Sequence, residues 1–489
     1  MRIVAAVLVW MLTAAPGAAA AAAQGDAGKT EKKKTAGTAQ QDDKAKKPKK
    51  AKKAKKAKKP KGDRPSPDEP ADAQAEETGG KGVRLSWKQH PSFRVGSVFR
   101  LDFQAKFQED GHVSYSGAKN IEPWEMHRNR IGISGHLFKH IEYEVERELT
   151  EKELTEKDIL EGVTPASHWK DVNVNVAYIN NAQVQIGKFK IPFGLDQLTG
   201  VTHNDFVYRS LGANYLAPAR DIGVMVHGRF FKRALNYWVG GFRHDGDNAR
   251  SKKIQGGDET VAGRVTGNPF RAAGPAFGGF QLGTAFTASA LSDDSFRPNG
   301  LRGRTLLTQE TFYEPVYVKG RRNRWEADVD WAVGPVSARG EYTLVLDSRN
   351  GQGLRDNDLV DARARAWYVS GSWLVTGEEK KRPVKPANDF LQGGIGAVEV
   401  VTRYERLWFD SVGGGDPYRS VRAEAILPAS DTAFTIGANW TLNRFIKLQV
   451  NGIREHTNGV REHSDETNRN PVQNGTAFWS RVFRLQIVL

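Results

Sequence analysis

Basic side chains occupy the polar face of several segments in which apolar and polar residues alternate. Because every second side chain of a β-strand points to the same side, this spacing would collect their charges on one surface. Guanidinium groups suit oxyanions, since their planar fork can contact two oxygen atoms at once. The residues selected by this register are Arg100, Lys106, Arg128, Arg130, Arg229, Arg339, Arg403 and Lys447.

Acidic side chains recur with the same spacing and would share that surface. They are Glu142, Glu144, Glu146 and Glu148 in one segment and Glu326, Asp328 and Asp330 in another. Such a mixture leaves two interpretations open for each basic residue. It could bind an anion, or it could form an ion pair with a neighbouring carboxylate.

The sequence lacks the motifs of common enzymes. It contains no G-x-S-x-G, no H-E-x-x-H and no glycine-rich phosphate loop. The absence of cysteine excludes disulfides, thiolate metal sites and cysteine nucleophiles. His136 and His140 are four residues apart, but on a strand and turn this spacing does not form a metal site. We expect no enzymatic activity, cofactor or metal, with a barrel enzyme of the phospholipase or protease type as the alternative.

The N-terminus predicts a targeting segment followed by a charged tail. Residues 1–23 combine Arg2, an apolar run and an alanine string, as a secretory signal peptide does. Residues 24–80 contain sixteen lysines and almost no side chain that could be buried, so we expect a disordered periplasmic tail. Secretion argues against nucleic acid as the partner of this tail. An anionic envelope polymer and no partner at all remain open.

Strict alternation dominates residues 81–489, which we predict to be one all-β domain. A soluble β-sandwich would alternate as well. About sixteen segments have this register, and many reach the length that a tilted strand needs to cross a bilayer. They are residues 94–108, 126–137, 140–150, 170–179, 182–191, 221–230, 234–243, 259–267, 279–291, 322–333, 335–347, 364–376, 395–409, 433–442, 445–456 and 476–489.

The connections and the C-terminus favour a transmembrane antiparallel β-barrel over the sandwich. Tight turns such as residues 138–140 alternate with long polar loops such as residues 151–170, as in outer-membrane barrels. We assign residues 304–312 to a loop, because one more strand would leave an odd number. The last segment should face lipid with Phe483, Leu485, Ile487 and Leu489 and the lumen with Arg484 and Gln486.

Five stretches resemble a known family in their order and spacing. Residues 128–148 (RNRIGISGHLFKHIEYEVERE), 177–194 (AYINNAQVQIGKFKIPFG) and 206–223 (FVYRSLGANYLAPARDIG) are similar to the core of the phosphate-selective porins O and P. Residues 374–378 (LVTGE) and 396–405 (GAVEVVTRYE) are similar to that family's downstream pattern. The resemblance covers essentially everything after Ser92.

This resemblance implies a sixteen-stranded barrel, usually a homotrimer, with a long third loop folded into the pore. In this sequence that loop would be residues 192–220. In the family, lysines and arginines at the constriction and along the lumen attract oxyanions. The positions on matching motifs are Lys188, Lys190, Arg209 and Arg220.

We therefore expect an outer-membrane porin that forms a diffusion channel for small anions, with inorganic phosphate or polyphosphate as the solute. Outer-membrane lipid would surround it. The alternative is a general diffusion porin, or one for another substrate, without phosphate selectivity. In that case the lysine-rich tail could act as an envelope anchor.

Overall fold

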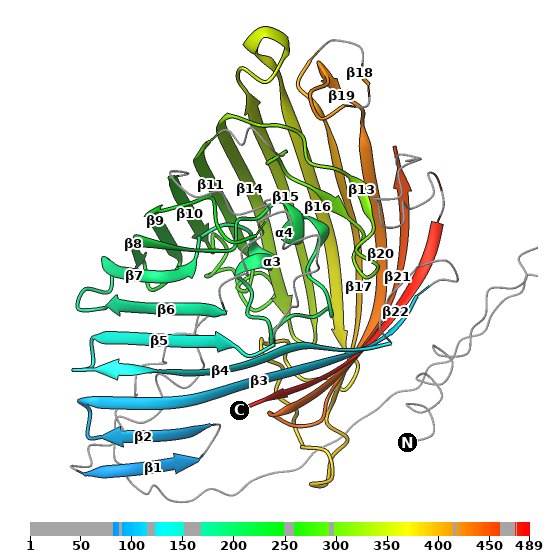
Figure 1. Ribbon diagram of the computed structural model, residues 1–489. Helices are drawn as coiled ribbons and strands as arrows, with labels where there is room; N and C mark the ends of the chain where they lie inside the picture. The colour runs from blue at the N-terminus through cyan, green and yellow to red at the C-terminus, as the bar shows by residue number, and fades with distance from the viewer. Residues whose placement is uncertain are drawn as a thin grey trace, which may run out of the picture. The chain divides into compact units, whose positions relative to one another are not determined.

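A long antiparallel sheet curls round and closes on itself in the computed structural model (Figure 1). In the described part of the chain, no helix is long and apolar enough to cross a membrane. The predicted signal peptide and lysine-rich tail lie outside the described residues. The structure describes residues 82–87, 90–114, 123–150, 168–248, 259–292, 298–413, 417–418, 420–459, 475 and 477–489.

Sixteen strands of the described chain form the wall, and the barrel closes where β22 pairs with β3. The predicted strand number and the barrel fold are therefore confirmed. The wall strands are β3 (Phe99–Val113), β4 (Trp124–Leu137), β5 (Ile141–Glu148), β6 (Trp169–Val176), β7 (Gln183–Lys190), β8 (Arg220–Phe230), β9 (Leu235–Phe242), β10 (Thr260–Gly267), β11 (Gln281–Leu291), β14 (Gly320–Val333), β15 (Val336–Arg349), β16 (Leu359–Leu374), β17 (Ala397–Ser411), β20 (Ala429–Thr441), β21 (Ile446–Asn458) and β22 (Ala477–Val488).

Long connections join the wall strands at one end of the barrel and mostly short turns join them at the other. The third loop (residues 191–219) follows β7, and the fifth loop (residues 292–319) follows β11. Residues 304–312 belong to this fifth loop, as predicted. They contribute to a small hairpin that is separate from the strands of the wall. The loop elements are α3 (Leu195–Leu198), α4 (Leu211–Tyr215), β12 (Gly303–Arg304), β13 (Thr311–Tyr313), η1 (Leu354–Asp356), β18 (Pro417–Tyr418) and β19 (Ala425–Ile426).

The prediction of one continuous strand over residues 94–108 is wrong. A turn interrupts it, in which Gly96 has φ +54° and Val98 N donates to Val95 O at 3.2 Å. Before this turn, β1 (Val83–Trp87) and β2 (Pro91–Val95) form a hairpin. This hairpin extends the sheet along the first residues of β3 (Figure 1). Glycine at the turn tolerates the positive φ, which alternation alone does not reveal.

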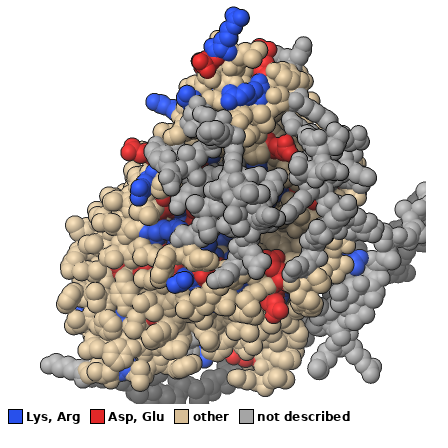
Figure 2. Space-filling model, viewed as in Figure 1, with Lys and Arg blue, Asp and Glu red and all other residues tan. Residues whose placement is uncertain are grey.

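The two faces of the wall differ as the alternation predicts. Phe103, Ile131 and Val224 are exposed on the outer face, which is the face that lipid would cover. Asp110 and Arg484 are buried on the inner face. In Figure 2 most of the wall formed by β3 to β7 is uncharged, whereas basic and acidic side chains mix nearer the long loops. The barrel therefore has an apolar exterior and a charged interior.

Candidate functional site

Apolar side chains fold the third loop into the barrel. Ile191 and Phe193 are fully buried where the loop leaves β7, and they pack with Phe189, Met225 and Phe242 of the inner wall. Removing these rings and aliphatic groups from water favours an inward path for the loop. The sequence analysis placed this loop in the pore, and the burial of its first residues agrees with that position.

A second apolar cluster holds the far part of the third loop. Leu211 and Leu216, in and after α4, are fully buried with Leu306 of the fifth loop and Leu407 of β17. The fifth loop therefore also lies against the inner wall. Together the two clusters fix the third loop at both of its ends.

Basic residues of the inner wall donate hydrogen bonds to carbonyl groups of the third loop. Arg484 donates to Val207 O at 2.7 Å, Arg403 to Tyr208 O at 3.1 Å and Arg324 to Leu216 O at 2.8 Å. Lys447 donates to Asn204 O at 2.9 Å. Three of these four cations also contact a carboxylate, as Arg484 does with Asp110 at 2.6 Å. Their positive charges are used to position the loop.

The long turn between β16 and β17 (residues 375–396) also reaches the third loop. Lys380 Nζ lies 2.6 Å from Asp205 Oδ1, and it contacts Glu399 as well. Arg382 Nη2 lies 3.1 Å from Asp205 Oδ2. Burial favours the neutral acid, but Arg382 and Lys380 hold the pKa of Asp205 well below its usual range. The loop is thus bound from the short-turn end of the barrel too.

Most of the basic residues selected from the sequence have hydrogen-bond or ion-pair partners. These partners leave them less free to bind an anion in the lumen. Arg220 contacts Asp171 through three hydrogen bonds, the shortest 2.6 Å. Lys190 Nζ donates to Leu198 O at 2.7 Å and to Thr199 O at 3.3 Å, so it supports the third loop. Lys188 Nζ donates to Trp169 O at 2.9 Å and lies 3.4 Å from Asp247.

The predicted cations on the neighbouring strands form ion pairs as well. Arg130 contacts Glu148 at 2.6 Å and Glu146 at 2.9 Å. Lys106 contacts Glu146, Arg100 contacts Asp102, and Arg339 contacts Asp330. Arg229 lies one residue from the short-turn end of β8, far along the strand from the third loop. Glu146 and Glu148 of β5 therefore act as partners of these cations.

Arg128 and Arg209, both selected from the sequence, lack a carboxylate contact among the described residues. Arg128 donates to Gln108 Oε1 at 2.6 Å, and Arg209 donates to Thr199 O at 2.7 Å. Arg209 Nη1 is buried and has no hydrogen-bond partner in the described part of the chain. Burial, together with Arg220 and Arg130, lowers the pKa of Arg209 to about 10. Arg209 remains charged at neutral pH, with the carboxylate of Asp196 and the cations Arg220 and Arg130 acting on it in opposite directions.

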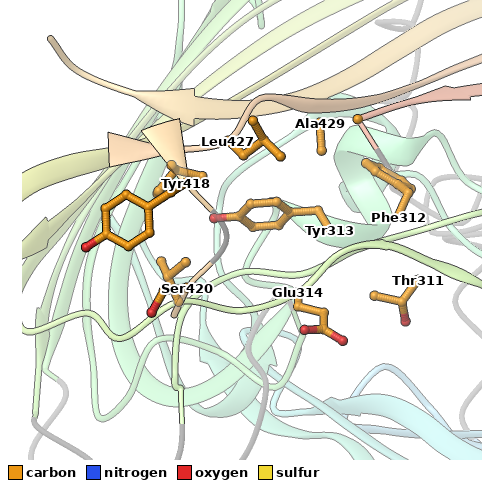
Figure 3. A pocket seen from close by; sticks show the side chains of 11 residues that line it. Thr311, Phe312, Tyr313, Glu314, Tyr418, Ser420, Leu427 and Ala429 are labelled. Carbon is orange, nitrogen blue, oxygen red and sulfur yellow. The ribbon is translucent and has the colours of Figure 1, made fainter. Parts of the chain in front are cut away.

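A small cavity lies elsewhere, between the fifth loop and the segment that carries β18 and β19. Tyr313 projects into it between Tyr418 and Phe312 (Figure 3). Its volume of about 30 Å³ suits a few water molecules. Its lining includes neither Arg128 nor Arg209. In the described residues, no three His, Asp or Glu side chains are grouped to hold a metal ion.

Comparison with known proteins agrees with this architecture. Residues 93–478 match the family described as phosphate-selective porin O and P. The chain belongs to this family. It is 22% identical over 463 residues to Porin O of Pseudomonas aeruginosa, covering 86% of this chain and 93% of that protein. The protein is thus an outer-membrane porin, a channel protein, with its long loops on the extracellular side.

Two solved porin structures match this chain over most of its length. OmpT of Vibrio cholerae is 11% identical with a TM-score of 0.49, and the alignment covers 81% of this porin and 99% of OmpT. An anion-selective porin from Comamonas acidovorans is 12% identical with a TM-score of 0.49, and the alignment covers 80% and 99% of the two chains.

The sequence analysis missed the residues that hold the third loop from the short-turn end of the barrel. Asp205, Lys380 and Arg382 were not selected, because the loop and the turn show no alternation. The unusual length of residues 375–396 for a periplasmic turn was the available signal. A long turn at this end has room to fold back into the lumen.

Proposed function

We propose that this porin conducts small anions, with phosphate as the preferred solute, and that Arg128 and Arg209 provide the selecting charges. The observation that carries the proposal is the lack of any carboxylate contact to these two guanidinium groups among the described residues. Most of the other candidate cations are paired. Unpaired positive charges in a passage partly walled off from water concentrate anions there.

The arrangement suits transient binding of an oxyanion. The planar guanidinium of Arg128 could contact two oxygens of one phosphate, and the positive charge of Arg209 acts on the same region. Nearby Arg130 and Arg220 add positive charge, but their carboxylate partners limit it. Weak sites of this kind allow a solute to enter and to leave, as conduction requires.

Planar-bilayer recordings test this assignment. In a KCl gradient the wild-type reversal potential should show anion preference, and added phosphate should reduce the chloride current. The double variant Arg128→Gln with Arg209→Gln should lose much of both effects. Arg229→Gln is the matched control near the periplasmic end of β8, where it should change little. Cation preference of the wild-type channel would refute the proposal, and anion preference without block by phosphate would favour the general porin.

We propose further that the porin is a homotrimer, as its family membership suggests, and that the lysine-rich tail contacts anionic envelope polymers. The sixteen lysines of residues 24–80 support the second proposal through charge alone. Mass measurement of the detergent-solubilised protein tests the first. Binding of purified envelope polymer to full-length protein and to a variant without residues 24–80 tests the second.

A further inference from the structure

Arginines occur on the outer face of the barrel, where lipid should make contact. Along β16, Ala362, Ala364 and Ala366 are buried in the inner apolar cluster. Arg363 and Arg365 alternate with them and therefore point outwards. Arginine facing the middle of a bilayer costs about 2–4 kcal/mol, and close to the interface the cost falls to about 0–1 kcal/mol. Their height along the wall therefore decides whether lipid tolerates them.

The neighbouring strand adds a third outward arginine beside them. Arg406 lies between Glu405 and Leu407 of β17, which are both buried inside. Arg406 is opposite Trp367, and Arg365 is opposite Trp408. The guanidinium carbons of Arg365 and Arg406 lie 4.8 Å and 5.6 Å from the Trp408 ring centroid. These side chains form one patch, which we call the outer arginine patch: Arg363, Arg365, Arg406, Trp408 and Asp410.

The outer arginine patch carries a net charge of about +2. Asp410 accepts hydrogen bonds from Arg363 at 2.7 and 2.9 Å and also contacts Arg365. No carboxylate of the described residues contacts Arg406. Asp410 thus pairs with two of the three guanidinium groups, and the exposed Arg406 can donate to a ligand with several acceptor oxygens.

The patch lies at the height of the outer-leaflet head groups. Trp373 marks the periplasmic end of β16, eight residues below Arg365. At about 3.3 Å per residue and a tilt of about 40°, Arg365 is about 20 Å further along the membrane normal. The apolar band of such barrels is about 25 Å tall, so the patch reaches its extracellular edge. Trp408, opposite Arg365, lies at the same height, where aromatic side chains are enriched in such barrels.

We propose that the outer arginine patch binds the phosphate groups of a phosphorylated glycolipid in the outer leaflet. Two observations favour this ligand. The patch is positively charged, as a phosphate ligand requires, and it is continuous with the wall that lipid contacts. Arginine forks bind phosphate oxygens in pairs, while the acyl chains pack against the apolar wall below. The proposal concerns the outside of the barrel and does not depend on which ions the channel conducts.

Native mass spectrometry of the full-length porin in detergent tests this binding. The probes are bisphosphorylated lipid A and the same lipid after removal of both phosphates. The wild-type protein should retain the phosphorylated lipid about tenfold more strongly. Equal retention of the two lipids would overturn the proposal, and this comparison needs no variant.

A double variant locates the site on the wall. Arg365→Gln with Arg406→Gln should reduce retention of bisphosphorylated lipid A to that of the dephosphorylated lipid. Arg147→Gln is the matched control, because Arg147 also stacks on an outer tryptophan, Trp169, with 5.3 Å to the ring centroid. It has no second arginine opposite it, since its partners are Ile131 and Trp169. Unchanged retention in the double variant, or an equal loss in Arg147→Gln, would contradict the assignment.

Discussion

Lys380 of the periplasmic turn and Asp205 of the third loop form a buried ion pair, with 2.6 Å between Nζ and Oδ1. Only 4% of Lys380 is exposed, and Glu399 of β17 contacts the same ammonium group. The pair joins three parts of the chain: a turn from one end of the barrel, a loop from the other, and the wall. The position of the third loop therefore depends on a turn outside its own sequence.

Replacing Lys380 with Met should loosen the third loop. The change leaves Glu399 without its cation and Asp205 with Arg382 alone, and breaking a buried pair from one side costs about 3–5 kcal/mol. We expect larger fluctuations of single-channel current and a lower temperature for the shift of the folded band on gels. Lys381→Met is the control, because the Lys381 side chain is 64% exposed. Identical behaviour of the two variants would show that the pair does not hold the loop.

A different buried group should tolerate loss of its charge. Among the described residues, neither carboxylate oxygen of Asp431 has a hydrogen-bond partner, although this residue is fully buried near Glu455. Glu455 accepts a hydrogen bond from Leu306 N at 2.6 Å and so fixes the fifth loop. Asp431→Asn removes one of two neighbouring negative charges, and an unsatisfied buried group costs about 1–3 kcal/mol. Folded Asp431→Asn porin should resist heating at least as well as wild type, and a lower transition temperature would disprove this.

Alternation allowed the barrel to be predicted because the bilayer and the lumen impose opposite preferences on successive residues. Arg484 and Gln486, for example, are buried inside as predicted, and the wall closes with the predicted number of strands. The first strand was the exception. Residues 94–108 keep their alternation through the turn at Gly96, because β2 and β3 pair side by side and present the same faces.

The candidate site was harder to predict, because its charges are decided by distant partners. Arg484 and Asp110 meet across the closure of the barrel although 374 positions separate them in the sequence. Arg220 matched a family motif, yet Asp171 neutralises part of its charge. A single sequence shows which residues are basic, but only the register of neighbouring strands shows which of them are paired.

His203 of the third loop should not become charged in mild acid. Burial lowers the pKa of His203 to about 4, and the nearby cations Lys447 and Lys106 act in the same direction. An ordinary histidine would gain charge between about pH 7.5 and about pH 5.5 and raise the anion preference. His203 stays neutral over this range, so wild type and His203→Gln should show equal shifts of reversal potential. A larger shift in the wild-type channel would mean that His203 is protonated.

Removing the charge of Asp171 should make the channel more anion-selective. Asp171 is buried on β6, and its oxygens accept hydrogen bonds from Arg220 Nε at 3.0 and 3.1 Å and from Nη2 at 2.6 Å. Asp171→Asn leaves the Arg220 guanidinium in place and removes the negative charge beside it. Because screening is weak inside a narrow passage, this local change should shift the reversal potential further towards the anion limit.

The direction of the shift in reversal potential is the test. Asp171→Asn should move it towards the anion limit, and Arg209→Gln should move it away from that limit. Asp410→Asn is the control, because Asp410 lies on the outer wall and its charge does not face the lumen. It should leave the selectivity unchanged. If Asp171→Asn lowers the anion preference or has no effect in a correctly folded barrel, Arg220 does not contribute to the potential along the ion path. The selecting charges would then be restricted to Arg128 and Arg209, for which the described chain provides no carboxylate contact.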